Sequence, residues 1–419
     1  RLGAGAGHFF RALSGQDMAG IDVVLHEIRP ALHGAGHAWS SQDFEADEDF
    51  FDFMLAQMAV SCAQLDPKKK GRTMCEIFGA YGWQEDAGEM RYLANFLLSR
   101  GVNRFSPHAF SMDAFPDPDS PPHFGTEQNP MMPFISRLFG HMARVCALIS
   151  GGRFLYQTAV LYYAEAEWAS GTAGCMKTQA VVKALNQRQI QCAVVPIDLL
   201  EEADFDLLLI PYAKSWPQTL FDRCRNLIDA GKAVYFVDGP PETLSAGEGD
   251  LSAMLRGIGT VALGSASELA MREAPLPYWP LTDTPGVRLY PYQKEDGTVF
   301  LLFNEDARQG VRYRFAVRDS RPAWLMDAEN EKLYPAQAVE NGGAQEITVD
   351  LEPGQLLAVL LTDRGNPAAD TPPVKTAVCG ALDCAWEITL RAAGAQAFER
   401  YMMTNRFFNV TAPGENPRF

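Results

Sequence analysis

The sequence predicts a multidomain chain in which α/β units are followed by all-β units. Three observations support this prediction. Predicted strands and helices alternate up to about residue 273, short strands with Gly-containing turns follow, and all seven histidines lie within the first 141 of the 419 residues. A chain of this length can form two to four domains. Histidines gather where protons are transferred or ligands are hydrogen-bonded, so we expect the first third to carry the chemistry.

In the first third, the sequence predicts three strands that alternate with three helices. The predicted strands are residues 20–30, 73–81 and 101–111, and the predicted helices are residues 50–65, 88–100 and 130–149. Such alternation is typical of βαβ units with a parallel sheet. Because all three strands end in polar residues, we expect residues 1–150 to be the C-terminal half of a (β/α)8 (TIM) barrel, with further strands before it.

The remaining residues divide into three further units. Short apolar runs separated by helices over residues 151–273 predict a doubly wound, flavodoxin-like α/β domain. Residues 274–365 predict a small antiparallel β-sandwich, with strands at 287–292, 298–304, 311–317, 345–351 and 355–362. A Pro-rich linker then leads to residues 374–419, which we expect to begin another β-rich domain.

Glu76 is the residue that the sequence singles out. It lies near the middle of an apolar run, residues 72–83, with a Gly-rich turn after it. A strand buried on both faces reads as a continuous apolar stretch, and an ionised carboxylate inside one is costly unless it is hydrogen-bonded or faces a cavity. At the carboxyl end of a barrel strand, Glu76 would face the cavity where the active sites of such folds lie. The alternative is a structural carboxylate satisfied by an arginine or by backbone amides.

Composition and motifs narrow the classes of function. The net charge of −16 argues against a nucleic-acid partner, and no apolar run reaches the roughly 18–20 residues that span a bilayer. His33 and His37 are four residues apart, but the glycines between them disfavour a helix, so we predict no metal site. The turn at residues 210–214 lacks the Cys of a class I glutamine amidotransferase, so we expect a catalytically silent flavodoxin-like domain. The eight cysteines are scattered without a disulfide-like spacing, which indicates free thiols in a reducing compartment and predicts a cytoplasmic protein.

Three stretches and the order of the units resemble a known family. Residues 75–83, 100–111 and 159–168, with barrel, flavodoxin-like unit and sandwich in that order, resemble clan A glycoside hydrolases of the family 42 β-galactosidase type. Residues 374–419, with Ala385-Trp-Glu-Ile and Phe408-Asn-Val-Thr, resemble the start of a galactose-binding-like domain. Because the chain begins at Arg1 and stops within that unit, we expect a fragment truncated at both ends.

The resemblance implies a function and assigns roles to two carboxyls. It implies a retaining, exo-acting O-glycoside hydrolase of plant or host glycans that needs no cofactor and uses Glu76 as nucleophile on the seventh barrel strand. The family's acid/base lies on the fourth strand, outside these residues, so we expect the fragment alone to be inactive. Glu27 is either the acid, if the strands are counted differently, or a supporting or substrate-binding group. The flavodoxin-like domain of the family trimerises, which implies a homo-oligomer.

Six further residues are expected to contact the sugar: His26, Tyr81, Trp83, Asn103, His108 and His123. Tyr81 and Trp83 could stack on its apolar face or pack in the core. His108 could bind a hydroxyl or cap its strand, and we favour the first because Asn103 and Ser106 are expected beside it. The expected partner is an oligosaccharide or glycoside, with neither nucleic acid nor membrane. The competing hypothesis is a non-catalytic glycan-binding or assembly protein on a decayed barrel.

Overall fold

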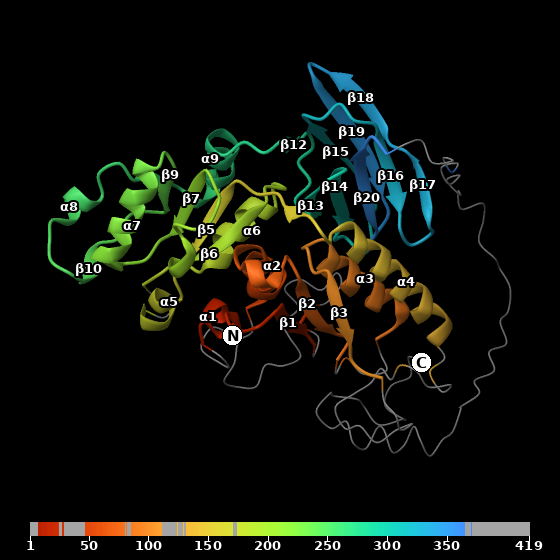
Figure 1. The fold of residues 1–419 in the computed structure, drawn as a ribbon, viewed down its shortest axis with the longest axis horizontal. Helices are drawn as coiled ribbons and strands as arrows, with labels where there is room; N and C mark the ends of the chain where they lie inside the picture. Colours follow the sequence, from red (N-terminus) through yellow and green to blue (C-terminus); the bar gives the residue numbers. More distant parts are fainter. Residues whose placement is uncertain are drawn as a thin grey trace, which may run out of the picture.

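Two parallel sheets and two antiparallel sheets form the main framework of the chain (Figure 1). The structure, a computed structural model, describes residues 7–24, 27–28, 47–79, 81, 85–110, 124, 129, 131–170, 174–364 and 370. Apart from Asp370, the Pro-rich linker lies outside this part, as do the β-rich unit expected over residues 374–419, His33 and His37.

The first sheet has three parallel strands in the order β1–β2–β3, namely β1 (Ala19–Val23), β2 (Thr73–Ile77) and β3 (Arg104–Pro107). Its helices are α1 (Phe9–Leu13), α2 (Ala56–Leu65), α3 (Ala87–Leu98) and α4 (Met132–Leu148), with a π-helical turn at Phe50–Leu55 before α2. Helix α3 begins where the Asp86 carboxylate accepts a hydrogen bond of 2.8 Å from the backbone N–H of Glu89. This N-cap satisfies one of the amides that a helix start leaves unpaired.

One face of the three-stranded sheet is packed and the other is open. In β2, Thr73, Cys75 and Ile77 are buried, whereas Met74 and Glu76 are partly exposed. The same alternation runs through β1, where Ala19, Ile21 and Val23 are buried. Because successive side chains of a strand point to opposite faces, β2 is a half-buried strand. The interpretation of the apolar run as a strand buried on both faces was therefore wrong, and Glu76 lies on the open face.

The second parallel sheet has five strands in the order β11–β9–β7–β5–β6. They are β5 (Thr158–Tyr162), β6 (Cys192–Pro196), β7 (Leu207–Pro211), β9 (Ala233–Val237) and β11 (Gly259–Val261). Numbered within this unit the order is 2-1-3-4-5, which is the order of flavodoxin-type doubly wound sheets. The helices of the unit are α5 (Ala164–Ser170), α6 (Thr178–Asn186), α7 (Gln218–Asp229), α8 (Leu251–Met254) and α9 (Ala266–Glu273). A parallel pair, β8 (Ser215–Pro217) and β10 (Thr243–Ala246), lies beside them.

The two antiparallel sheets follow in the chain. The four-stranded one has the order β12 (Tyr278–Pro280), β15 (Val311–Val317), β19 (Ala344–Leu351), β18 (Gln337–Asn341). The six-stranded one has the order β17 (Lys332–Pro335), β16 (Ala323–Asp327), β20 (Leu356–Thr362), β14 (Gly297–Asn304), β13 (Val287–Lys294), β4 (Arg153–Phe154). Strand β4 precedes the five-stranded unit in sequence, yet Phe154 pairs with Tyr292 and Arg153 with Gln293.

A buried ion triad ties the first unit to the antiparallel sheets. Glu305, which follows β14, binds Arg100 through one carboxylate oxygen and Arg288 through the other, both at 2.5 Å. The three side chains are at most 12% exposed. Burial alone would raise the pKa of Glu305, but the charges of Arg288 and Arg100 outweigh it and lower the pKa to about 2. The carboxylate is therefore ionised, and it holds elements that are far apart in the sequence.

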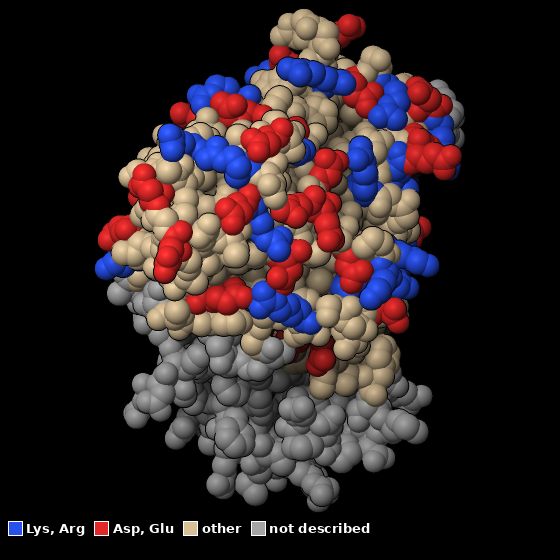
Figure 2. Space-filling view, turned by 60° about the vertical axis from the view of Figure 1, so that its left-hand side comes forward, with Lys and Arg blue, Asp and Glu red and all other residues tan. Residues whose placement is uncertain are grey.

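The surface carries charges of both signs. Figure 2 shows acidic and basic side chains interspersed over one face of the molecule. A mixed surface on a chain of net charge −16 offers poor attraction for a polyanion. Within the part of the chain that is described, no helix combines the length and the apolar character needed to cross a bilayer.

Candidate functional site

The site is built around Glu76 and His108. Glu76 is the fourth of the five residues of β2, and its side chain is 46% exposed. His108 directly follows β3, and its backbone N–H donates to the carbonyl of Ile77 at 2.9 Å, which extends the pairing with β2. The imidazole Nδ1 lies 3.1 Å from Glu76 Oε1. The carboxyl ends of two adjacent parallel strands thus bring a half-exposed carboxylate and an imidazole into hydrogen-bonding distance.

A tight turn after β2 supports this pair. Phe78 is buried and has a φ of 75°, a conformation that a bulky residue adopts only when packing enforces it. Its ring meets that of Phe124 edge-on, with centroids 6.0 Å apart. A Cβ on Gly79 would lie 2.9 Å from Val24 Cγ1 and 3.3 Å from the ring carbon Cγ of His108. The His108 ring therefore rests directly on the Gly79 backbone.

Replacing Gly79 by Ala is expected to displace the His108 imidazole and to lower the free energy of unfolding by about 1–3 kcal/mol, the usual cost of overpacking. The added methyl group meets Val24 and His108 at less than ordinary contact distance. Denaturant unfolding and the imidazole NMR signals of His108 measure the two effects. Gly15→Ala is the matched control, since a Cβ there meets no atom within 4 Å. An unmoved His108 signal in the Gly79 variant would contradict this view of the turn.

A row of polar side chains crosses the open face of the sheet. Asp22 of β1 and Ser106 of β3 are the register partners of Glu76, and both are exposed. Register partners on parallel strands point to the same face, so the three side chains lie side by side. Asp22 was not predicted as a site residue from the sequence. Its signal was the alternation in which Asp22 stands between two apolar residues, Ile21 and Val23.

The structure gives Glu27 a local role. Its carboxylate accepts a hydrogen bond of 3.3 Å from the backbone N–H of Val24, and its own N–H donates to the carbonyl of Val24 at 3.1 Å. Burial raises the pKa of the Cys75 thiol well above its ordinary value, and the charges of Asp22, Glu27 and Glu76 add to the rise. The charges of all three carboxyls are thus felt at Cys75, the residue before Glu76 in β2.

Two residues expected to contact sugar are packed instead. Tyr81 is fully buried, and its hydroxyl donates to the carbonyl of Ile28 at 3.3 Å, which favours the core role. Asn103 lies at the amino end of the strands, where its Oδ1 accepts from the N–H of Thr73 at 3.0 Å. Its Nδ2 donates to the carbonyls of Gly71 and Ile149. The expectation that Asn103 lies beside His108 was wrong, since the strand separates them. His26, Trp83 and His123 lie outside the described residues.

Glu85 is a buried carboxyl that the sequence did not single out. Its side chain is fully buried, and neither oxygen has a hydrogen-bond partner among the described residues. Burial raises its pKa well above the ordinary value, and the charges of Glu89 and Asp86 add to the rise. Burial raises the pKa of Tyr81 well above its ordinary value, and the charge of Glu85 is the second-largest cause of that rise. A group whose pKa is raised by folding favours the folded state below its unfolded pKa, and that advantage is lost as the pH rises to the folded value.

Glu85→Met is therefore expected to raise the free energy of unfolding by about 1–3 kcal/mol at pH 8, because it removes an unsatisfied buried polar group. At pH 4.5 the gain should be smaller, because this pH is close to the ordinary pKa of Glu and the unfolded chain then also holds part of the proton that the folded state keeps on Glu85. Urea unfolding at the two pH values measures this difference. Glu268→Met, at an exposed position of α9, should show no pH-dependent gain. An equal gain for Glu85→Met at both pH values would show that folding does not raise the pKa of Glu85.

Comparison with known proteins finds matches among solved structures. No protein-family model matches the sequence, and no curated protein matches it either. A rhamnosidase from Novosphingobium sp. PP1Y aligns with 88% of this chain and 37% of its own, at a TM-score of 0.62 and 16% identity. A β-galactosidase from Bacillus circulans sp. alkalophilus aligns over 85% of this chain and 62% of its own, at a TM-score of 0.57 and 12% identity.

A GH42 β-galactosidase from G. stearothermophilus, solved as a catalytic mutant, aligns over 84% of this chain and 61% of its own, with a TM-score of 0.55 and 11% identity. The chain thus spans less than two thirds of each of these proteins. At such low identity the likeness concerns the fold. The resemblance to family 42 β-galactosidases is confirmed at that level: the chain has the mixed α/β and β multidomain fold of these glycoside hydrolases.

Proposed function

We propose that the protein is a retaining, exo-acting O-glycoside hydrolase of plant or host glycans, with Glu76 as its nucleophile. The observation that carries the proposal is the position of Glu76, half-exposed near the carboxyl end of a parallel strand and 3.1 Å from an imidazole. Active sites of (β/α)8 barrels lie at the carboxyl ends of their strands. In this proposal β1, β2 and β3 belong to such a barrel, followed by a flavodoxin-like domain, a β-sandwich and the start of a galactose-binding-like domain.

The chemistry needs an ionised carboxylate held in one orientation. The nucleophile attacks the anomeric carbon and forms a covalent glycosyl intermediate, which water then hydrolyses. When His108 carries its proton on Nδ1, it donates to Glu76 Oε1 and leaves Oε2 for the attack. His108 is then a positioning residue, which itself rests on Gly79. The reaction needs no cofactor.

A retaining mechanism also needs a second carboxyl, about 5–5.5 Å from the first, to protonate the leaving oxygen. The family resemblance implies an acid outside these residues; among the described residues the candidates are Asp22, the register partner of Glu76, and Glu27, in the turn after β1. Asp22 lies on the neighbouring strand, and neighbouring strands are about 4.8 Å apart. Glu27 is engaged by the backbone of its own turn, which suits a supporting role. Removing the acid should slow substrates with poor leaving groups far more than dinitrophenyl glycosides.

Covalent trapping tests the proposal in the full-length protein. A 2-deoxy-2-fluoro glycoside with a dinitrophenyl leaving group, made with galactose and with rhamnose, should accumulate as a glycosyl-enzyme. Mass spectrometry of the digested protein should place the label on the peptide that contains Glu76. Glu76→Gln should abolish the label and Glu268→Gln should not. A label on another carboxylate, or none from either sugar, would refute Glu76 as nucleophile.

The competing function is a non-catalytic glycan-binding or assembly protein. The burial of Tyr81 and Asn103 favours this alternative, because two of the side chains expected to contact a sugar are not available to one. In that case Glu76→Gln should leave sugar affinity and any measured hydrolysis unchanged. Under either function, the family resemblance implies self-association through the five-stranded unit, which light scattering on the purified protein would detect as a mass above that of one chain.

A further inference from the structure

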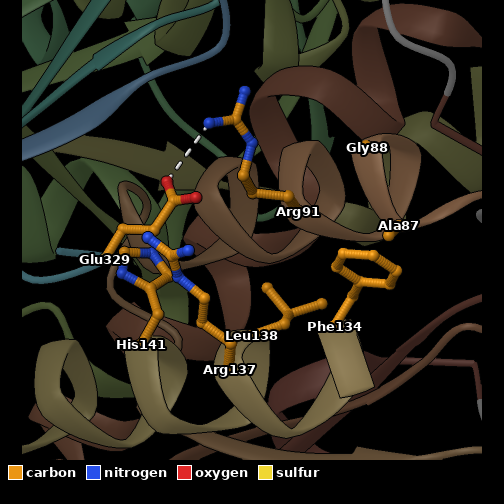
Figure 3. A pocket seen from close by; sticks show the side chains of 8 residues that line it. All are labelled: Ala87, Gly88, Arg91, Phe134, Arg137, Leu138, His141 and Glu329. Carbon is orange, nitrogen blue, oxygen red and sulfur yellow. Dashed lines mark hydrogen bonds and ion pairs between the residues drawn. The ribbon is translucent and has the colours of Figure 1, made fainter. Parts of the chain in front are cut away.

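We propose that a pocket between α3, α4 and the turn after β16 binds a single pyranose residue, at a place separate from Glu76. The pocket has a volume of about 210 Å³ (Figure 3). All its lining residues come from α3, α4 and Glu329, and none lies on the strands that carry Asp22 and Glu76. The inference stands on the side chains of the pocket and does not rest on the proposed hydrolysis.

One wall offers an aromatic ring to solvent. Phe134, near the start of α4, is 64% exposed although it is a large apolar side chain. Leu138 lies one turn further along the helix and continues the apolar wall. The residues of α3 beside them are Ala87 and Gly88, which are too small to cover the ring. An exposed ring of this kind is a surface on which the C–H face of a sugar can stack.

The pocket is also lined by charged hydrogen-bonding groups. Arg91 of α3 forms an ion pair with Glu329 at 3.2 Å, and both side chains are about one third exposed. Arg137 of α4 donates to the side-chain oxygen of Asn330 at 2.5 Å. A guanidinium has five N–H donors and a carboxylate accepts several hydrogen bonds, so each group retains capacity for a ligand. Vicinal hydroxyls, which both donate and accept, match such a mixed set.

The floor of the pocket holds a buried acceptor. His141 is 1% exposed, and its Nε2 lies 2.7 Å from Asn95 Oδ1. The amide of Asn95 is fixed, because its Nδ2 donates to the carbonyl of Gly354 at 3.1 Å. Nε2 must therefore carry the proton, which leaves Nδ1 as an acceptor. Among the residues described, Nδ1 is buried without a hydrogen-bond partner.

The neutral state of His141 follows from its surroundings. Burial is the largest cause that lowers the pKa of His141 to about 4, so the ring is uncharged at pH 7. A buried acceptor without a partner costs free energy, so the floor of the pocket keeps an unsatisfied polar group. Figure 3 shows the imidazole beside the Arg137 and Glu329 side chains. A purely apolar ligand would leave the remaining donors of Arg91 and Arg137 and the remaining acceptor sites of Glu329 unused, whereas a polyhydroxylated ring can hydrogen-bond to them and stack on Phe134.

Sugar titration tests the inference. The probes are methyl galactoside, methyl rhamnoside and galacturonic acid, with glycerol as a polyol that cannot stack. They are titrated into the full-length Glu76→Gln variant and followed by saturation-transfer NMR and calorimetry. At least one sugar should bind, and Phe134→Ala and Arg137→Gln should each weaken it tenfold or more. Both side chains are at the surface, so the variants should fold, which their circular dichroism checks.

Matched controls remove similar side chains elsewhere. Val339→Ala truncates another apolar side chain that is 64% exposed, and Arg188→Gln removes another exposed arginine. Neither should change the affinity. Absence of binding for all three sugars, or equal affinity in Phe134→Ala and Val339→Ala, would overturn the pocket assignment. Retained binding together with failure to trap a glycosyl-enzyme would refute the proposed function and leave the pocket standing.

Discussion

Replacing Glu76 by Gln is expected to lower kcat/KM for an aryl glycoside on the order of 10⁴-fold or more, the scale seen when a nucleophile is removed. The amide keeps the shape of the carboxylate but lacks the charge needed to attack the anomeric carbon. Because the Glu76 side chain is 46% exposed on the open face of the sheet, the fold should persist. Initial rates together with an unfolding curve measure both properties.

Two controls sharpen the result for Glu76. Glu268→Gln changes an exposed carboxylate of α9 and should keep full activity. Sugar affinity of Glu76→Gln should stay within a few-fold of the wild type, since the amide can still hydrogen-bond. A variant that hydrolyses glycosides at the wild-type rate would exclude Glu76 from the chemistry and favour the glycan-binding alternative.

The second large effect is expected on stability. Glu305→Gln should lower the free energy of unfolding at pH 7 by about 3–5 kcal/mol, because Arg100 and Arg288 would remain buried without a counter-charge. The side chains of both arginines are less than one tenth exposed, so water cannot replace the carboxylate as their partner. Denaturant unfolding measures the change. Asp283→Asn, which breaks an exposed pair with Arg188, should cost no more than about 1 kcal/mol.

The loss of unfolding free energy in Glu305→Gln should become smaller as the pH falls. Folding lowers the pKa of Glu305 to about 2, so its contribution is complete above the unfolded pKa of roughly 4.3 and is lost as the pH falls towards 2. The difference between wild type and Glu305→Gln should therefore shrink between about pH 4 and pH 2. A difference that stays constant over this range would show that the triad does not stabilise through the charge of Glu305.

The pair of Glu76 and His108 could be predicted because its signal is local. Each residue stands near the carboxyl end of one of two consecutive strands, and parallel pairing brings such ends together. Asp22 had the same kind of signal, an acidic residue between two buried neighbours. Asn103 was misplaced because its distance along the chain was overlooked. It precedes β3 and His108 follows it, so the whole strand lies between them, and its hydrogen bond to Thr73 lies at the amino end.

Other features needed the packed structure. Glu85 stands in a polar stretch that is typical of an exposed loop, yet it is fully buried. The five strands expected after residue 274 are all present, but β12, β16, β17 and β18 were missed. All five residues of β18 are exposed, so it has no apolar alternation to detect. The triad joins Arg100, Arg288 and Glu305, and nothing in the sequence indicates that these positions meet.

Strand β4 changes how the chain should be divided. It occupies the outer edge of the six-stranded sheet beside β13, where the ring of Phe154 stacks on that of Tyr290 at 4.9 Å. The backbone of Gly152 approaches so closely that a Cβ would lie 2.1 Å from the carbonyl oxygen of Gln293. The five-stranded unit is thus an insertion between two strands of one sheet. Severing the polypeptide at residue 273 would strip β13 of its outer neighbour and leave unpaired amides that invite aggregation.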